Sequence, residues 1–551
     1  MKFVSNFLAS TIVFSVLTFG IWESSANPYP FEFLQCLSLH SPKGADSIFN
    51  LIYTPTNSSF SHILNFSIRN LRFSTATTPK PLLIITPLHP SHVQALVICC
   101  KVHGFQIRIR SGGHDYEGLS YVSDVPFMLV DLGDYRSIAI DTQNNTAWVE
   151  SGATLGELHY RIAKKSQTLA FPAGGCPTVG IGGHLSGGGH GGLLRKYGLA
   201  ADHVVDALLV DANGKLLDRK SMGEDLFWAI RAGGGGSFGI VLAWKIKLVY
   251  VPPTVTVFTV SKKMDQNTLK LIHQWQYVAS KLDENLFIGI TLIIGPNNSR
   301  QGGRRTRTRT RTVNASFFSL FLGKANELLS IMQKSFPELG LLKEDCIENN
   351  WIESFLILAG FTNGESLEEA LLNRSTTPSY IGAYKVKSDY VKEPISEIGL
   401  NGMWQMLRTT NIESASIVLL PYGGKMNEFS ESEIPYPHRS GYVFKIGYFV
   451  VWKAIGVKAA DRHLIWSREV YDYMAPFVSK SPRSAYIGYR DIDIGMNKEF
   501  GKGTSYKEAS IWGLKYFGNN FKRLVQVKTK VDPYEFFRYE QSIPSFVLQW
   551  S

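Results

Sequence analysis

The chain has 551 residues, of which 44% are hydrophobic, 12% aromatic and 19% charged, and its formal net charge is +11. The length allows two to four domains, and the composition is that of an ordinary globular protein. Five of the positive charges belong to one Arg-Thr run, Arg304–Arg311, so the net charge does not indicate nucleic-acid binding. We interpret this run as a solvated surface loop, which can also attract acidic wall polysaccharide non-specifically.

The N-terminus has the pattern of a secretory signal peptide over residues 1–26. Lys2 precedes the apolar segment Phe7–Trp22, and small residues follow at Ser24–Ala26. The apolar segment is short for a membrane span, which needs about 20 residues, and no later segment is long enough. We therefore predict a secreted protein of the extracellular space, cell wall or vacuole, with an uncleaved membrane anchor as the alternative. Secretion also predicts glycans, and acceptor sequons occur at Asn57, Asn65, Asn144, Asn297, Asn314 and Asn373.

The five cysteines are Cys36, Cys99, Cys100, Cys176 and Cys346. An odd number in an oxidising compartment leaves at least one unpaired or otherwise used. We pair Cys36 with Cys99, which would join the N-terminal segment to the first helix. Cys176 is either a buried free thiol or a residue that is used for a cofactor.

The region from Pro81 to Val251 alternates between short strands and helices. Thr154 has the position of a helix N-cap, and Asn213-Gly214 that of a hairpin turn. The predicted helices are Ser91–Gly104, Gly152–Ser166 and Asp225–Gly236, and the predicted strands are Leu82–Thr86, Phe105–Arg110, Phe127–Leu132, Ser137–Asp141, Thr146–Ser151, His203–Asp211, Lys215–Arg219 and Gly239–Val251.

The pattern changes after Pro252-Pro253, where longer amphipathic helices mix with strands. We interpret Val255–Ser479 as a second, α+β domain with one large sheet. No repeat with a period of 20–50 residues occurs, which argues against a solenoid or propeller. The predicted strands of this region are Thr256–Ser261 and Leu286–Ile294, and the predicted helices are Met264–Leu282, Ala325–Phe336 and Asp461–Met474.

Two nucleophilic side chains lie in glycine-rich segments, His114 in Arg110–Tyr121 and Cys176 in Phe171–Gly192. Because glycine has no side chain, the backbone can approach a flat ligand closely there. Two such sites predict one cofactor that is held at two points. The GxGxxG matches that begin at Gly187 and Gly234 lack the strand-then-helix context of a dinucleotide-binding fold, so we do not predict that fold. Backbone N–H groups of such loops can still bind a pyrophosphate.

Four segments resemble those of plant berberine bridge enzyme-like proteins: Arg110–Tyr121, Cys176–Ala207, Asp218–Ile240 and Lys530–Pro544. This family is the secreted branch of the vanillyl-alcohol-oxidase flavoprotein superfamily, which also includes the cannabinoid synthases. The resemblance covers nearly all of the chain after the signal peptide. It implies an α+β fold with a PCMH-type FAD-binding domain (27–251), a substrate-binding domain with a large antiparallel sheet (252–480) and a C-terminal segment that returns to the FAD domain (481–551).

The resemblance implies an FAD that is bonded to the chain twice. A ring nitrogen of His114 would bond to a methyl group of the flavin, and the sulfur of Cys176 to the adjacent ring carbon. The double attachment would prevent flavin loss outside the cell and make the flavin a stronger electron acceptor. Val179 matches the family position beside the face where oxygen approaches, and its small size favours O2 as acceptor. The other cofactor-binding residues that the resemblance implies are Ser111, Gly112, Gly113, Gly180, Gly182, Gly183 and His184.

Catalysis requires a group that takes a proton as hydride leaves the substrate carbon. Tyr116 and Tyr489 match family tyrosines near the flavin and the substrate, and Lys445 matches a lysine of the alcohol-oxidising members. A phenol with an ordinary pKa of about 10 is a poor base at neutral pH, and a nearby cation such as Lys445 would favour the phenolate. Gly447 stands where relatives have a glutamate or glutamine. His190 replaces a usual tyrosine, and it either binds substrate, acts as a base or fills space.

The predicted function is that of an FAD-linked oxidase that transfers hydride from a small alcohol to flavin and then to O2, which gives H2O2. The alcohol would be a lignin-precursor allylic alcohol or a sugar hydroxyl. One alternative is oxidative ring closure: loss of the glutamate at Gly447 argues against an alkaloid substrate, and Tyr489 leaves a prenylated phenol open. The other is a flavin-binding glycoprotein with little turnover. We expect a monomer, and we assign no metal and no nucleic-acid partner.

Overall fold

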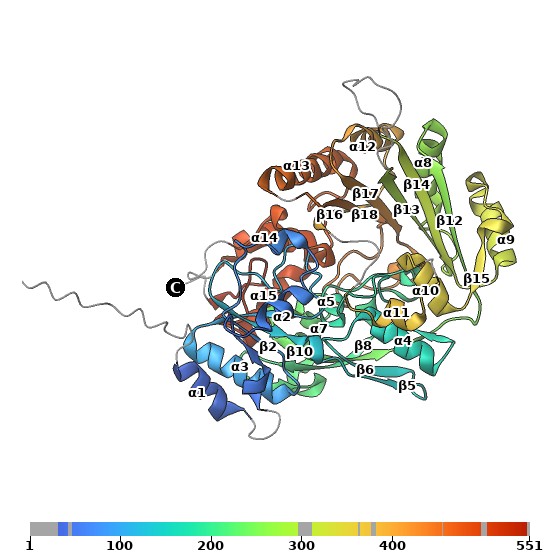
Figure 1. Cartoon of the computed structure of the whole chain (residues 1–551). Coiled ribbons are helices and arrows are strands. Elements are labelled where there is room, and N and C mark those ends of the chain that lie inside the picture. The colour runs from blue at the N-terminus through green and yellow to red at the C-terminus, as the bar shows by residue number, and fades with distance from the viewer. Residues whose placement is uncertain are drawn as a thin grey trace, which may run out of the picture.

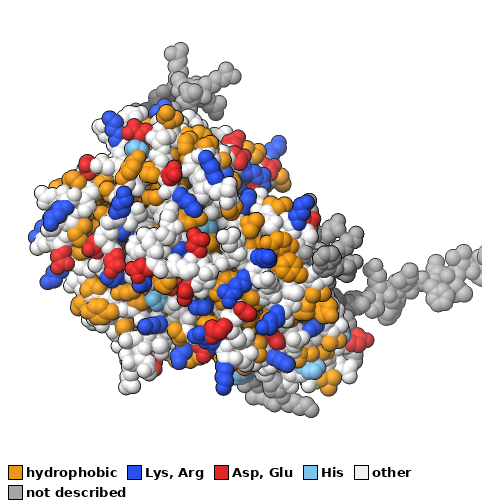
Figure 2. All heavy atoms as spheres, turned by 180° about the vertical axis from the view of Figure 1, so that it is seen from behind, with side chains coloured by type: hydrophobic (Ala, Val, Ile, Leu, Met, Phe, Trp, Pro, Cys, Tyr) orange, Lys and Arg blue, Asp and Glu red, His pale blue; other side chains and the backbone are white. Residues whose placement is uncertain are grey.

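The computed structural model of the chain describes residues 31–41, 47–295, 311–361, 364–375, 382–454, 456–497 and 504–547. The predicted signal peptide, the Asn297 sequon and all of the Arg-Thr run except Arg311 lie outside these ranges. Within them, no helix has the length and apolar character that crossing a membrane requires. Figure 2 shows basic and acidic side chains interspersed over one face of the molecule. Four of the remaining sequons have exposed asparagines, and Asn314 is half-buried.

The N-terminal part contains a four-stranded sheet in the order β1-β2-β4-β3, in which β2, β4 and β3 run parallel. Helix α3 connects β2 to β3 and packs against α1. The predicted disulfide between Cys36 and Cys99 joins these two helices, and the neighbouring Cys100 is a buried free thiol. The bounds are β1 Ile52–Tyr53, β2 Leu83–Ile85, β3 Gln106–Arg110, β4 Phe127–Asp131, α1 Phe31–His40, α2 Phe60–Phe66 and α3 Pro90–His103.

A five-stranded antiparallel sheet follows in the order β5-β6-β10-β8-β9. Thr154 begins α4 as predicted, because its side chain and that of Glu157 form a capping box. The bounds are β5 Ile138–Asp141, β6 Thr146–Glu150, β8 Val204–Val210, β9 Leu216–Leu217, β10 Ile240–Lys247, α4 Leu155–Lys165, α5 Ile181–Ser186, α6 Leu194–Tyr197 and α7 Arg219–Ile230.

Two predictions in this region were wrong in their bounds. An additional turn, which Asp218 begins by accepting a hydrogen bond from the Ser221 amide, precedes the predicted helix, and Gly223 (φ +74°) interrupts the helical backbone two residues before the predicted start at Asp225. Helix α7 ends at Ile230, six residues before the predicted end. The strand predicted from Gly239 to Val251 is divided after Lys247. At that point Leu248 donates to the carbonyl of Asn145 in the β5–β6 turn, and the chain continues as β11 (Val249–Tyr250), which pairs with β7 (Leu169–Ala170).

The second part of the chain forms the expected large antiparallel sheet, in the order β15-β12-β14-β13-β17-β18-β16. In Figure 1 this sheet stands above the N-terminal part, with α8, α12 and α13 on one side. Only β12 and β13 were predicted individually. The bounds are β12 Val255–Lys263, β13 Leu286–Ile294, β14 Val313–Phe321, β15 Ile347–Asn349, β16 Ala383–Val391, β17 Ser414–Pro421, β18 Phe444–Trp452, α8 Gln266–Val278, α9 Ala325–Ser335, α10 Trp351–Ala359, α11 Leu367–Leu372, α12 Glu397–Thr409 and α13 Val457–Met474.

The C-terminal segment leads from β18 and α13 back to the first part. It contains α14 (Tyr506–Phe517) and α15 (Asn520–Val531), and α15 packs against α7. The buried Nζ of Lys528 donates to the carbonyl of Ser237 at 2.6 Å, which anchors α15 to the N-terminal part. Before α14, the short 3₁₀ turn Ile487–Tyr489 passes beside β16, and its Tyr489 ring contacts that of Tyr116, so three distant stretches of sequence meet there.

Candidate active site

A cavity of about 430 Å³ lies where the N-terminal part, the large sheet and the C-terminal segment meet. A volume of this size is typical of a small-molecule or cofactor site. Its walls come from the His114 loop, the Cys176 loop, strands β16 and β18 and the turn Tyr486–Arg490. The cavity therefore brings together three of the four predicted catalytic residues, Tyr489, Tyr116 and His190. The fourth, Lys445, lies directly behind its wall.

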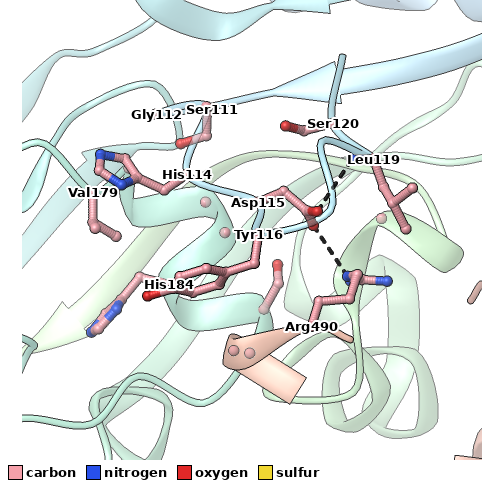
Figure 3. A pocket seen from close by; sticks show the side chains of 18 of the residues that line it. Ser111, Gly112, His114, Asp115, Tyr116, Leu119, Ser120, Val179, His184 and Arg490 are labelled. Atoms are coloured by element: carbon pink, nitrogen blue, oxygen red, sulfur yellow. Dashed lines mark hydrogen bonds and ion pairs between the residues drawn. The ribbon is translucent and has the colours of Figure 1, made fainter. Parts of the chain in front are cut away.

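The loop after β3 presents His114 through a glycine turn. Gly113 has φ +70°, and a Cβ there would lie 1.7 Å from the carbonyl oxygen of Ser67, so only glycine fits. The following Asp115 accepts hydrogen bonds from the amides of Glu117 (3.0 Å) and Leu119 (3.1 Å) and forms an ion pair with Arg490 at 3.1 Å (Figure 3). The loop is thus fixed at both ends.

The second glycine-rich loop packs directly on the first. A Cβ on Gly112 would lie 2.4 Å from the amide nitrogen of Gly180, and Ser111 Oγ donates to the carbonyl of Ser151 at 2.5 Å. In contrast, a Cβ on Gly183 would meet nothing within 4 Å, and Gly182 and Val179 also line the cavity. The predicted cofactor residues are therefore of two kinds: some hold the loops together and others face open space.

Thr178 connects the two predicted attachment residues. Its hydroxyl oxygen lies 2.8 Å from Nε2 of His114 and 3.8 Å from Sγ of Cys176. Burial lowers the pKa of His114 to about 3, and the charge of Arg69 adds to this effect, so the imidazole is neutral at neutral pH. Burial raises the pKa of the Cys176 thiol, whereas the Thr178 hydrogen bonds and Arg69 oppose that rise. The thiolate, which is the nucleophile, thus depends on these neighbours.

Aromatic rings form the other side of the cavity. The ring of Tyr489 lies 5.5 Å from that of Tyr116 and 5.1 Å from that of Tyr486, and the Tyr116 ring lies 5.6 Å from that of Tyr384. Phe449 adds a fifth ring, 5.4 Å from Tyr489. These edge-to-face contacts fix the orientation of both predicted catalytic tyrosines.

Lys445 is fully buried, and its Nζ has no hydrogen-bond partner among the described residues. Nζ lies 4.0 Å from the ring centroid of Tyr486 and 4.2 Å from that of Tyr489. Burial lowers the pKa of Lys445 well below its usual value. Burial therefore disfavours the cation that was expected to favour a phenolate, whereas the two ring faces beside Nζ stabilise a cation. The role of Lys445 as a cation stays a prediction.

His190 lies in the cavity wall, where its ring stacks on Tyr486 at 5.7 Å. Its Nε2 is buried without a hydrogen-bond partner in the described part of the chain, and burial lowers its pKa well below the usual value. A neutral imidazole with an unused nitrogen suits substrate binding or proton transfer better than space filling. His184, in contrast, accepts a hydrogen bond from the Gly174 amide at 3.2 Å and so supports the backbone of the loop.

Gly447 departs from the expected pattern in a way that the structure explains. A Cβ at this position would lie 2.6 Å from Cε2 of Phe449 and 3.2 Å from Cε2 of Tyr489. Residues 447 and 449 are on the same face of β18, so the phenyl ring occupies the space of a side chain at 447. An aromatic wall thus replaces the carboxylate or amide.

Sequence reasoning missed several residues of the site. Thr178 lies in the glycine-rich segment assigned to the cofactor, but nothing in the pattern marks its hydroxyl, and Tyr384, Phe449 and Arg490 lie where the local pattern gives no sign of a ligand. The exception is Arg108, a charged residue within a strand whose neighbours are apolar; it is buried, and such a residue signals a specific partner.

Buried polar atoms in the cavity wall test whether FAD fits. Arg108 Nε and Nη1, Ser120 Oγ and Arg490 Nη1 have no hydrogen-bond partner among the described residues. Guanidinium groups with free donors suit an anionic pyrophosphate, and the open space at Gly175 and Gly183 suits a flat ring system. The donor set fits the cofactor.

Two family models match the chain: the FAD binding domain over residues 81–219, and berberine and berberine like over residues 485–544. A tetrahydroberberine oxidase of Berberis wilsoniae is 50% identical over 98% of both chains. The chain belongs to the berberine bridge enzyme-like family. It is therefore an FAD-linked oxidoreductase that acts on a small molecule.

Two further relatives bear on the chemistry. A monolignol oxidoreductase of Arabidopsis thaliana is 47% identical over 99% of both chains. The solved structure of Phl p 4, a grass pollen allergen with glucose dehydrogenase activity, has a TM-score of 0.85 and 44% identity and covers 94% of this chain and all of its own. An isoleucine-to-valine variant of Phl p 4 is described as a glucose oxidase.

Proposed function

We propose that this berberine bridge enzyme-like protein is a secreted, bicovalently flavinylated oxidase that converts a small aromatic allylic alcohol to a carbonyl compound, with O2 as electron acceptor. The observation that carries the proposal is that His114 Nε2 and Cys176 Sγ, both of residues that line the cavity, meet at one buried hydroxyl, that of Thr178. Two nucleophiles this close can bond to one ring system, which is what double attachment requires.

The flavin, when bound, supplies the acceptor for the hydride. Arg108, Arg490 and the loop amides would hold its anionic part. The chain must take the hydroxyl proton of the alcohol, and Tyr489 is placed for this because its ring lies beside Tyr116 in the cavity wall. Lys445 Nζ lies over the face of that ring, where it would act on the phenol through the ring and not as its proton acceptor. Burial lowers the pKa of Lys445 and so weakens it as a base.

The aromatic wall supports a planar aromatic alcohol over a sugar. Gly447 and Phe449 replace a polar group by a ring, and Tyr116, Tyr384 and Tyr489 complete a set of flat surfaces. Offset and edge-to-face contacts with such rings favour another ring. The monolignol oxidoreductase among the relatives agrees with this choice, whereas the glucose dehydrogenase supports a sugar as the second candidate.

Val179 supports O2 as the acceptor. It lines the cavity beside Cys176, and its side chain is smaller than isoleucine. In Phl p 4 an isoleucine-to-valine change accompanies the description as an oxidase, and we propose that Val179 has that role here.

The test is anaerobic reduction of the purified yellow protein by coniferyl alcohol and by D-glucose, followed by admission of air. Fast bleaching by coniferyl alcohol, an aldehyde product that hydroxylamine traps, and one H2O2 per turnover would support the proposal. A product that has lost two hydrogens but forms no oxime would indicate ring closure instead. Bleaching by neither alcohol, nor by other alcohols of a panel, would favour a flavin-binding protein with little turnover. Glycan analysis and the N-terminal residue of the protein from its native source test secretion.

A further inference from the structure

We propose that Thr178, assisted by Arg69, is the positioning residue that prepares His114 and Cys176 for attachment to the flavin. This inference rests on the double attachment proposed above. It adds a step that precedes catalysis, and it assigns that step to two residues that do not line the cavity.

The first observation is the position of one hydroxyl between two nucleophiles. Thr178 Oγ1 lies 2.8 Å from Nε2 of His114 and 3.8 Å from Sγ of Cys176, and both distances are within hydrogen-bond range for their elements. A hydroxyl has one proton, so it can donate to only one of the two and must accept from the other.

The direction of these hydrogen bonds decides the reactivity. When Thr178 accepts from His114 Nε2–H and donates to the sulfur, the lone pair of the imidazole is on Nδ1 and the hydroxyl stabilises the Cys176 thiolate. Both groups are then nucleophilic at the same time. In the opposite direction, Nδ1 carries the proton and the sulfur remains a thiol, so neither attachment can begin. Thr178 therefore couples the state of one nucleophile to that of the other.

The second observation is a half-buried guanidinium in the segment that supports the His114 loop. Arg69 belongs to the segment Ser67–Asn70, on which the His114 loop rests: Asn70 Nδ2 donates to the carbonyl of Tyr116 at 3.0 Å, and Gly113 packs on Ser67. Nη2 of Arg69 donates to the carbonyl of Arg374, and its Nε is buried without a hydrogen-bond partner in the described residues.

The Arg69 charge acts on both nucleophiles in the same favourable sense. It lowers the pKa of His114, which keeps the imidazole neutral, and it lowers that of Cys176, which favours the thiolate against burial. A cation at this place thus opposes protonation of either group.

Each attachment is an oxidation, and dioxygen is its oxidant. A bond from nitrogen or sulfur to carbon replaces one C–H bond of the flavin, and the nucleophile loses its own proton. Two protons and two electrons are released per bond, and they reduce one O2 to H2O2. Complete attachment therefore consumes two O2 and gives two H2O2 per chain.

The experiment compares the full chain with Thr178→Val, Thr178→Ser and Arg69→Gln. Each secreted protein is purified early, incubated aerobically with FAD and digested, and the masses of the peptides that contain His114 and Cys176 give the fraction attached at each residue. We expect Thr178→Val to slow attachment at Cys176 roughly tenfold or more, because a hydrogen bond to a charged group is lost. The attachment rate of Thr178→Ser should stay near that of the wild type. The rate of Arg69→Gln should lie between those of Thr178→Val and the wild type. Thr86→Val, a buried threonine outside the cavity, is the matched control.

Equal attachment rates in Thr178→Val and the wild type would overturn this inference alone. A wild-type chain without flavin on either peptide would overturn the double attachment and this inference with it. If Thr178→Val does not accumulate as folded protein, the attachment rates of Thr178→Ala and Arg69→Gln are compared with that of the wild type instead. Rates equal to the wild type would again overturn the inference. Peroxide release in the absence of any alcohol gives a second readout. In a variant whose peptide masses show slower attachment, this release should be slower to the same extent.

Discussion

Two buried lysines of the large sheet should respond oppositely to the same substitution. Lys445 on β18 is 0% exposed and has no hydrogen-bond partner for Nζ among the described residues. Lys385, on the neighbouring strand β16, is 1% exposed and forms ion pairs with Glu117 and, at 2.6 Å, with Asp491. Methionine has nearly the length of lysine but no charge, so Lys→Met removes the amine and keeps most of the packing.

The expected magnitudes follow from what each change leaves behind. Lys385→Met leaves two buried carboxylates with fewer partners, and breaking such pairs costs about 3–5 kcal/mol. We expect a cost at the lower end of this range, because both carboxylates keep a partner. Arg72 still pairs with Glu117 at 3.0 Å and Lys387 with Asp491 at 2.8 Å. Lys445→Met removes an amine that burial disfavours when charged, so the free energy of unfolding should be unchanged or higher.

The pH dependence of stability is a second test of the expected direction of the Lys445→Met effect on the free energy of unfolding. Because the pKa of Lys445 is lowered in the folded protein, the unfolded chain binds more protons between the folded pKa and its own ordinary value of about 10.4. The free energy of unfolding of the wild type therefore rises with pH across that window. The advantage of Lys445→Met should be largest at low pH and should disappear as the pH approaches the unfolded value.

The same substitution should slow flavin reduction less than Tyr489→Phe does, because Lys445 Nζ lies over the face of the Tyr489 ring and does not exchange its proton. The assays are urea unfolding from pH 5 to 9 and anaerobic flavin reduction by stopped flow, both on flavin-loaded protein. If Lys445→Met destabilised the fold as much as Lys385→Met, Nζ would have a strong partner in the folded enzyme, and the neutral-amine argument would fail.

Three other substitutions test the cavity walls. Tyr489→Phe should slow flavin reduction by about 10²-fold or more while the flavin stays attached, and a rate near that of the wild type would remove Tyr489 from proton transfer. Gly447→Gln should cost about 1–3 kcal/mol because the new side chain collides with Phe449, and Phe449→Ala should relieve much of this cost in a double-mutant cycle. Val179→Ile should slow reoxidation by O2 but not reduction by the alcohol; equal effects on both half-reactions would contradict a role in oxygen access.

The sequence predicted those parts of the fold and site that depend on local pattern. Thr154 begins its helix as expected, because a capping box involves residues only three apart. Strand β13 has the predicted bounds, because its apolar run and its flanking turns are local signals. The glycine-rich segments around His114 and Cys176 could be recognised for the same reason, since glycine at a close backbone approach leaves a trace in the sequence itself.

The parts that failed depend on distant partners. The division of the strand from Gly239 to Val251 is caused by Asn145, about a hundred residues away, which accepts the amide of Leu248. The charge state of Lys445 depends on burial by strands and rings whose pairing no local pattern specifies. Phe449 takes the place of a side chain at Gly447 only because both point to one face of a strand that was not predicted.

The cavity wall concentrates unsatisfied polar groups, and the ion pairs behind it explain how the fold tolerates them. His190, Lys445 and Arg108 each have a buried nitrogen without a partner among the described residues, which costs stability unless a ligand supplies one. Directly behind, Lys385 joins Glu117, three residues after His114, to Asp491, two residues after Tyr489. Both the His114 loop and the Tyr489 turn are therefore held by one satisfied cluster. Since binding groups must keep their geometry before the ligand arrives, a rigid support is what allows this site to remain unsatisfied without collapsing.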